Sequence, residues 1–204
     1  MYLDGKYAFG LALMHALWLH VGQQVSDDEI AELQAADTLE KAKQRALGLI
    51  SYRPRSVAEV QRRLKRAGVD AAMIDKVVDD LRAAGLLDDE SFSKAWVESR
   101  LGASPRSSRM IAWELRQKGV AESAVETALA DVNDEDSAYR LALKRWPRVA
   151  KLPERQERRR KLGEYLARNG YGYDTIQETI SRIEQENNAG SAADEDLDYG
   201  VEQE

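Results

Sequence analysis

The sequence predicts an all-α protein: an elongated array of three tandem three-helix repeats, with a small N-terminal β-hairpin and helix segment and a disordered acidic C-terminal tail. Three observations support this prediction. A motif of leucine, three variable residues, glycine and an apolar residue returns at 64–69, 115–120 and 166–171. Capping-box patterns, which open helices, recur ahead of the first motif. Only four prolines and thirteen glycines occur in 204 residues, and this scarcity favours helices over a β-sandwich.

The first 36 residues form a separate segment in this prediction. Apolar residues stand on both sides of Asp4 and Gly5, and Asp-Gly favours a type I′ turn, so we expect a short β-hairpin. Ser26 and Glu29 then have the spacing of a capping box, which predicts a short helix over 27–36.

A leading helix is predicted over 37–52. Asp37 and the glutamate three residues later have the same capping-box spacing, and small or aliphatic residues follow on one side of the helix. Pro54 interrupts the helix, because proline lacks a backbone N–H and clashes with the preceding turn. Ser56, again with a glutamate three residues on, begins the first helix of the first repeat.

Glycine ends the recurring motif, and helices often end with a glycine in the left-handed conformation. If Gly68 is that residue, then Leu64 and Val69 occupy the two positions whose side chains touch in a Schellman cap. The same spacing is found once in the following helix and once in each later motif. We therefore predict helix-capping roles for Gly68, Gly85, Gly119 and Gly170.

The motifs lie at a constant interval, since Leu64, Leu115 and Leu166 are 51 residues apart. A unit of this size buries too little surface to be stable alone, so neighbouring repeats should stack. The end of the chain is polar and acidic and has few aliphatic side chains, which is typical of disorder. The predicted divisions are the N-terminal hairpin and short helix (1–36), the leading helix (37–52), repeat 1 (53–101), repeat 2 (102–146), repeat 3 (147–186) and the disordered acidic tail (187–204).

The net charge of −6 is unevenly distributed. Residues 184–204 contain eight acidic residues and no lysine or arginine, so residues 1–183 carry a net charge of +2. Residues 144–168 contain ten basic and three acidic residues. A basic body with an acidic tail is compatible with binding to a polyanion.

Several functional classes are disfavoured. The chain has no cysteine, which excludes disulfides and thiolate metal sites. The apolar run at 8–21 is too short to span a bilayer and lacks the features of a signal peptide, so we expect a cytoplasmic protein with no membrane partner. No phosphate-binding glycine loop, metal-ligand cluster or nucleophile with a base partner is apparent, so we expect no catalysis, no metal and no cofactor.

A basic stripe is predicted on the first helix of two repeats. On an ideal helical wheel, three arginines and a tryptophan of repeat 2 lie about 140–220° from Ile111, opposite the apolar face. Exposed tryptophan beside arginine is typical of binding surfaces. In the third repeat the same sector offers only Arg160, opposed by two glutamates. The candidate contacts to a filament or DNA are Arg55, Arg62 and Lys65 in repeat 1 and Arg106, Arg109, Trp113 and Arg116 in repeat 2. An ordinary solvated helix face is the alternative interpretation.

The basic run at 144–161 is denser still, and it adds Arg155, Arg158 and Arg159 to the candidates. Here too, a solvated helix face competes with contact to nucleic acid. If about six basic side chains each neutralise one phosphate, affinity should fall roughly a thousandfold between about 50 and 200 mM salt.

Two stretches carry a resemblance to a known family: SYRPRSVAEVQRRLKRAGVDAAMIDKVVDDLRAAGLLDDESFSKAWVESRL at 51–101 and SPRSSRMIAWELRQKGV at 104–120. Arg-Pro-Arg-Ser, Leu-x-x-x-Gly-apolar and Gly-Leu-Leu-Asp-Asp-Glu, in this order, are a distinctive combination. They are similar to the RecX family of bacterial recombinase regulators. The resemblance covers about residues 1–183. The chain departs from the family pattern in three places. The first strand of the hairpin is nearly missing, Gln156-Glu157 replaces Pro-Arg in the third repeat, and the acidic tail lies outside the pattern.

The resemblance implies a cytoplasmic, non-enzymatic regulator with three tandem three-helix repeats. Its implied partners are the RecA protein and the nucleoprotein filament of RecA, in whose groove such proteins are thought to lodge, with inhibition as the usual effect. We also expect weak, non-specific contact with DNA, a monomeric state and a role in recombination, DNA repair and the SOS response. Two alternatives stay open: a stand-alone helical DNA-binding module, and a non-enzymatic helical adaptor for another protein.

Overall fold

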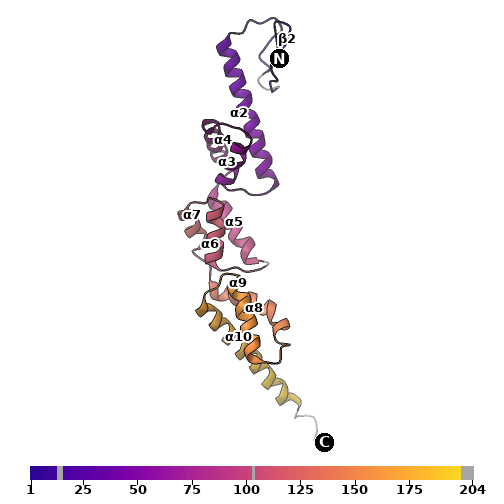
Figure 1. The fold of residues 1–204 in the computed structure, drawn as a ribbon, viewed down its shortest axis with the longest axis vertical. Helices are drawn as coiled ribbons and strands as arrows, with labels where there is room; N and C mark the ends of the chain where they lie inside the picture. The colour runs from indigo at the N-terminus through magenta and orange to yellow at the C-terminus, as the bar shows by residue number, and fades with distance from the viewer. Residues whose placement is uncertain (13–15, 103, 199–204) are drawn as a thin grey trace. The chain divides into compact units, whose positions relative to one another are not determined.

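The structure is a computed structural model that describes residues 1–12, 16–102 and 104–198 (Figure 1). The chain forms two compact units, Met1–Phe92 and Ser93–Glu204. The first unit contains β1 (Tyr2–Leu3), β2 (Lys6–Tyr7), α2 (Asp27–Tyr52), α3 (Val57–Arg66), α4 (Ala71–Ala83) and the start of α5 (Asp89–Gly102). The second contains the rest of α5, α6 (Ser108–Gln117), α7 (Glu122–Leu129), α8 (Asp134–Val149), α9 (Arg155–Arg168) and α10 (Tyr173–Asp198). The predicted all-α class, with a small strand pair at the N-terminus, is confirmed.

The N-terminal hairpin forms as predicted. β1 and β2 are antiparallel, with Tyr2 opposite Tyr7. Asp4 and Gly5 both have positive φ angles, 49° and 79°, as a type I′ turn requires. The rings of Tyr2 and Tyr7 meet edge to face with their centroids 5.7 Å apart, which adds a cross-strand contact to this very short pair.

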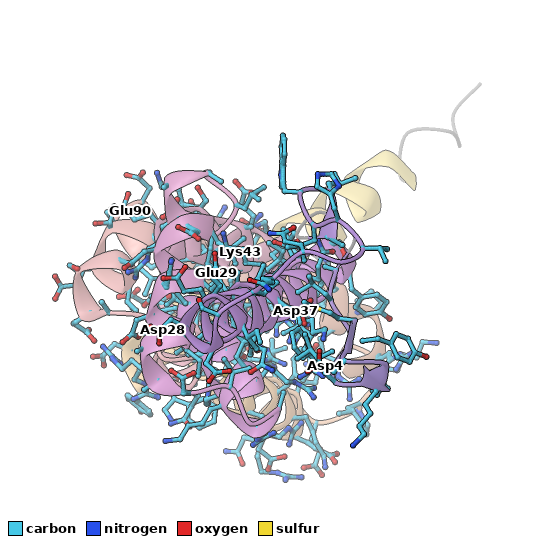
Figure 2. All side chains as sticks on the ribbon, turned by 90° about the horizontal axis from the view of Figure 1, so that it is seen from above. Asp4, Asp28, Glu29, Asp37, Lys43 and Glu90 are labelled. Atoms are coloured by element: carbon cyan, nitrogen blue, oxygen red, sulfur yellow. The ribbon has the colours of Figure 1, made fainter. Side chains whose placement is uncertain are left out.

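The helix α2 is continuous over 26 residues, so the predicted division between a short helix at 27–36 and a leading helix at 37–52 is wrong. Ser26 and Glu29 do form the predicted capping box. Asp37 does not begin a helix: its buried carboxylate accepts a hydrogen bond from the Ala12 N–H at 2.7 Å and pairs with Lys41 at 2.5 Å. Figure 2, which is viewed from above relative to Figure 1, shows Asp37 on the side of α2 that faces the N-terminal segment.

The core of the first unit lies where α2, α3 and α4 pack together. α3 begins at the predicted capping box of Ser56 and Glu59. An ion pair between Lys43 and Asp80, 2.6 Å long, links α2 to α4 beside the core. The buried apolar side chains of this core are Ala42, Ala46, Val57, Val60, Leu64, Ile74, Val77, Val78, Leu81 and Leu87.

The second unit has its main core between α8, α9 and α10, while α6 packs on α7. Leu162 and Leu166 of α9 are fully buried there. Tyr171, in the turn after α9, is buried and donates a hydrogen bond to the Ser137 hydroxyl of α8 at 3.0 Å. Burial raises the pKa of Tyr171 to about 12, so this phenol stays protonated and keeps its donor at physiological pH.

The four glycines singled out in the sequence all have left-handed φ angles, between 67° and 92°. At Gly68, the Val69 N–H donates to the Leu64 carbonyl at 3.2 Å and the Gly68 N–H donates to the Lys65 carbonyl at 3.0 Å. These are the two hydrogen bonds of a Schellman cap. The same pair of bonds is present at Gly85, Gly119 and Gly170.

An aspartate at the start of a later helix caps an earlier one in each unit. In the first unit, Asp89 at the start of α5 accepts the Val57 N–H at the start of α3, at 2.9 Å. In the second, Asp134 at the start of α8 accepts the Ser108 N–H and hydroxyl at the start of α6, at 2.7 and 2.8 Å. These bonds tie helices that are far apart in the sequence.

The groups of helices that pack together begin one helix earlier in the chain than the predicted repeats do. The leading segment 37–52 belongs to α2 and packs with α3 and α4, not apart from them. Predicted repeat 3, 147–186, contains the end of α8, then α9 and most of α10, and the group that packs there is α8 to α10. A regular spacing of glycines sets the length of a repeat but not its starting point, which depends on contacts between helices.

The last helix runs further than the sequence indicated. The tail was predicted to begin at residue 187, whereas α10 continues to Asp198; residues 199–204 lie outside the described residues. No proline interrupts this stretch, and its alanines favour helix continuation. Across the described residues, none of the helices is both long enough and apolar enough to cross a membrane.

Candidate nucleic-acid and protein interface

The solvent face of α6 carries the central part of the predicted stripe. Ser107 caps the helix by accepting the Met110 N–H at 3.2 Å. Ile111 and Leu115 are fully buried on one side of α6. The helical period therefore turns Trp113 toward solvent, where 59% of the residue is exposed, and Arg109 and Arg116 are exposed as well.

The two exposed arginines of α6 have surface partners. Arg109 donates to the Gly170 carbonyl at 3.0 Å, and Arg116 forms a two-point contact with Glu122, one bond of which is 2.8 Å long. The hydrogen bonds that Arg116 donates to Glu122 hold the pKa of Glu122 below its usual value and raise the pKa of Arg116. Exposed pairs of this kind contribute little to stability, so a phosphate can replace Glu122 as the partner of Arg116 at small cost.

Arg106 belongs to a different cluster, centred on Glu114. This carboxylate is only 8% exposed, and it accepts hydrogen bonds from the Trp96 indole at 2.8 Å and from Arg100 at 2.6 Å, as well as from Arg106. Two cations lie close to the Trp96 ring: the Arg100 guanidinium carbon is 4.0 Å and the Lys118 ammonium 4.1 Å from its centroid. The cluster joins α5 to α6, so Arg106 is held by the fold and is only partly available to a ligand.

Sequence reasoning missed the Glu114 cluster. The available signal was the acid itself: Glu114 falls beside the apolar face of α6, between buried residues, where an ionised carboxylate needs partners. That signal does not identify the partners, because Trp96 and Arg100 come from another helix.

The candidate residues of the first unit differ in how far they are exposed to solvent. Arg55 is half buried and its Nε donates to the Leu49 carbonyl at 3.4 Å, near the end of α2. Arg62 and Lys65 are exposed on α3, and the Arg62 Nε donates to the Ala58 carbonyl at 3.1 Å. Arg63 and Arg66, which the stripe did not include, are also exposed there. Cations in the last turn of a helix are favoured by its dipole, which explains part of this charge without a ligand.

The third group of candidates makes contacts within the fold, although the Arg155 side chain stays 68% exposed. Arg155 and Arg159 both bind Glu184 of α10, at 2.9 and 2.6 Å, and Arg159 also donates to Gln177 at 3.0 Å. Arg158 donates to the carbonyls of the loop before α9, at 2.8 and 3.1 Å. All three arginines therefore have partners within the fold, and the prediction that they contact a filament or DNA stays a prediction. The sequence could not identify Glu184 as a partner, because it lies on another helix.

Changing Glu184 to glutamine should lower the melting temperature at pH 7 by roughly 5 °C. Hydrogen bonds from Arg155 and then Arg159 hold the pKa of Glu184 below its ordinary 4.5. A carboxyl group with a lowered folded-state pKa stabilises the fold above its unfolded-state pKa and loses that effect as pH falls through the folded-state value. The gap in melting temperature between wild type and E184Q should thus narrow below pH 4.5, as followed by circular dichroism; a gap that stays constant down to pH 3 contradicts the assignment.

Three family models match the chain in sequence order. They are described as the first, second and third three-helix domains of RecX, and they match residues 42–81, 88–129 and 133–180. The first match covers the end of α2 with α3 and α4, the second covers α5 to α7, and the third covers α8, α9 and the start of α10.

Curated relatives carry the same family name. A protein of Bacillus subtilis (strain 168) named "Regulatory protein RecX" is 30% identical over 192 residues, which cover 92% of this chain and 72% of the relative. One of Prosthecochloris aestuarii with the same name is 34% identical over 143 residues, 70% of this chain and 93% of the relative.

Two solved structures are similar in fold. One described as the crystal structure of regulatory protein RecX has a TM-score of 0.69 and 30% identity, and it covers 89% of this chain and 91% of that one. One of RecX from Lactobacillus salivarius has a TM-score of 0.65 over 74% of this chain and 99% of that one; at 24% identity it supports the fold alone.

Proposed function

Because the chain belongs to the RecX family of regulatory proteins, we propose that it binds the RecA recombinase, or the filament that RecA forms on DNA, and inhibits its recombinase, ATPase and strand-exchange activities. The observation that carries this proposal is the succession of three RecX domains over residues 42–180 of this chain. The curated relatives are named regulatory proteins, which supports a regulatory role. The protein acts as a cytoplasmic monomer by binding alone, without a cofactor, and its setting is recombination, DNA repair and the SOS response.

The distribution of charge supports a target that contains both protein and nucleic acid. The exposed faces of α3 and α6 present basic side chains, among them Lys65, Arg109 and Arg116. Such surfaces attract phosphates and acidic protein patches together, and they speed up association with a polyanionic filament.

A stand-alone module that reads duplex DNA is less well supported. Domains of this type place a recognition helix, usually the last of the group, in the major groove. In the first two groups that helix is α4 or α7, whose exposed side chains include Asp75, Asp79, Glu122 and Glu126. Acidic residues at these positions repel the phosphate backbone. No contact in the described residues favours the adaptor alternative.

The proposed inhibition is tested by titrating the protein into a RecA ATPase assay on single-stranded DNA. The wild type should reduce ATP hydrolysis at stoichiometric ratios. The double variant R109A/R116A should raise the half-inhibitory concentration by about tenfold, because it removes two exposed phosphate-binding charges from α6.

The matched control removes the same charge from another face. R160A/R168A deletes two exposed arginines of α9, one of which already pairs with Glu164 at 2.7 Å, and it should inhibit like the wild type. If a large excess of the wild type leaves ATP hydrolysis unchanged, the proposed function is incorrect. If the two double variants are equally impaired, α6 is not the contact surface.

A further inference from the structure

Trp113 differs from the other tryptophans of the chain in both exposure and charge. Trp96 is held by Glu114 and two cations, and Trp146 packs against the core of α8 to α10. Trp18 is 83% exposed, but no lysine or arginine occurs between Lys6 and Lys41. Trp113 alone among these four is exposed on a basic helix face.

The neighbours of Trp113 on α6 are cationic. Arg109 precedes it by four residues and Arg116 follows by three, which places both beside it on the same helix face. From Arg106 to Lys118 the only acidic residue is Glu114, and that carboxylate is buried and already bound by two arginines. No carboxylate of α6 itself neutralises the charge beside the indole; Arg116 pairs with Glu122 of α7, where both side chains are about half exposed, so a phosphate can replace that partner.

We propose that Trp113 stacks on an unpaired base of single-stranded DNA while Arg109 and Arg116 bind the phosphates on either side. This inference deepens the proposed function by naming the residues that meet the DNA of the filament. Aromatic side chains on basic surfaces are the usual platforms for unpaired bases, because every base offers a π-face and the phosphates follow the cations. In a duplex the base faces are covered by their neighbours, so the indole has no access and single strands are preferred.

The surface also suits DNA better than an apolar protein partner. An aromatic anchor in a protein interface needs a dry pocket, and arginines on both sides of Trp113 would be desolvated with it at a high cost. The same arginines gain charge-assisted hydrogen bonds when the ligand carries a phosphate for each of them.

The test measures, in the absence of RecA, the binding of the protein to a fluorescein-labelled oligo(dT) of twenty nucleotides by fluorescence anisotropy. W113A should weaken binding about tenfold, and W113F, which keeps an aromatic face, by no more than about threefold. On an abasic oligonucleotide of equal length, W113A and wild type should bind alike, because no base is there to stack. W18A, the matched control with an exposed tryptophan in a stretch of sequence without lysine or arginine, should bind oligo(dT) like the wild type.

The charge component is measured through salt. On single strands, log K falls with log salt in proportion to about 0.7 per phosphate contact, so R109A/R116A should reduce the slope by about 1.4. W113A should leave the slope unchanged, because the indole binds a base and not a phosphate.

The outcomes separate this inference from the proposed function. Unchanged oligo(dT) binding by W113A, or an equal loss on the abasic oligonucleotide, overturns the stacking role. If W113A keeps its DNA affinity but loses inhibition of RecA, Trp113 contacts protein and the inference fails while the proposed function stands. If the wild type binds oligo(dT) through Trp113 but never affects RecA, the inference stands and the proposed function fails.

Discussion

Replacing Gly170 by alanine is expected to destabilise the second unit by about 2–5 kcal/mol. Gly170 has a φ of +92°, which costs about 1–2 kcal/mol for a residue with a Cβ. The new Cβ would also lie 2.5 Å from the Ser107 hydroxyl and 2.8 Å from the Met110 Cβ. Both atoms belong to the first turn of α6 or its cap, and overpacking of this kind costs about 1–3 kcal/mol more.

Gly68 supplies the control, because it has a φ of +80° but open space around the position of a Cβ. G68A should cost only the backbone term, about 1–2 kcal/mol. The comparison is made by urea unfolding followed by circular dichroism, which reports both units. A loss for G170A no greater than that for G68A contradicts the predicted clash between the α9 turn and α6.

Removing the Glu114 side chain is expected to have the second largest effect. E114A leaves the Trp96 indole N–H without its acceptor and two arginines without their shared carboxylate. Breaking a buried pair by removing one partner costs about 3–5 kcal/mol. The Arg100 and Arg106 side chains keep 29% and 39% of their surface exposed and regain water, so we expect about 2–4 kcal/mol.

Two variants define the cause of that loss. E114Q keeps an acceptor for Trp96 but removes the charge, so it should fall between wild type and E114A. E122Q removes a glutamate that pairs with Arg116 on the surface, where both side chains are about half exposed, and should leave the unfolding midpoint unchanged. If E122Q and E114A prove equally mild, Glu114 does not organise the contact between α5 and α6.

The features that could be predicted from sequence are those determined by a few residues that are adjacent in the chain. The cap at Gly68 needs only the residues from Leu64 to Val69, and all of them are adjacent in the chain. The same holds for the capping box at Ser56 and for the turn at Asp4. In each case a local hydrogen bond or a φ angle limits the choice of residue.

The features that could not be predicted depend on partners elsewhere in the chain. Arg155 and Arg159 have the density of a nucleic-acid contact in the sequence, but Glu184 binds them from 29 and 25 residues away. Asp37 has the spacing of a helix start, but its carboxylate is bound by Ala12 and the helix continues. A charged residue in a helix can be exposed to a ligand or can bind a group elsewhere in the fold, and the sequence alone does not identify a partner on a distant segment.

The aspartate bonds between helix groups have a consequence for synthesis on the ribosome. Ser108, in the first turn of α6, leaves the exit tunnel before its acceptor Asp134, which lies 26 residues further along the chain. Val57, at the start of α3, likewise precedes its acceptor Asp89 by 32 residues. The first two nascent groups therefore complete these hydrogen bonds only when the beginning of the next group has emerged. Fragments cut between these groups lack a bond that the full-length chain supplies.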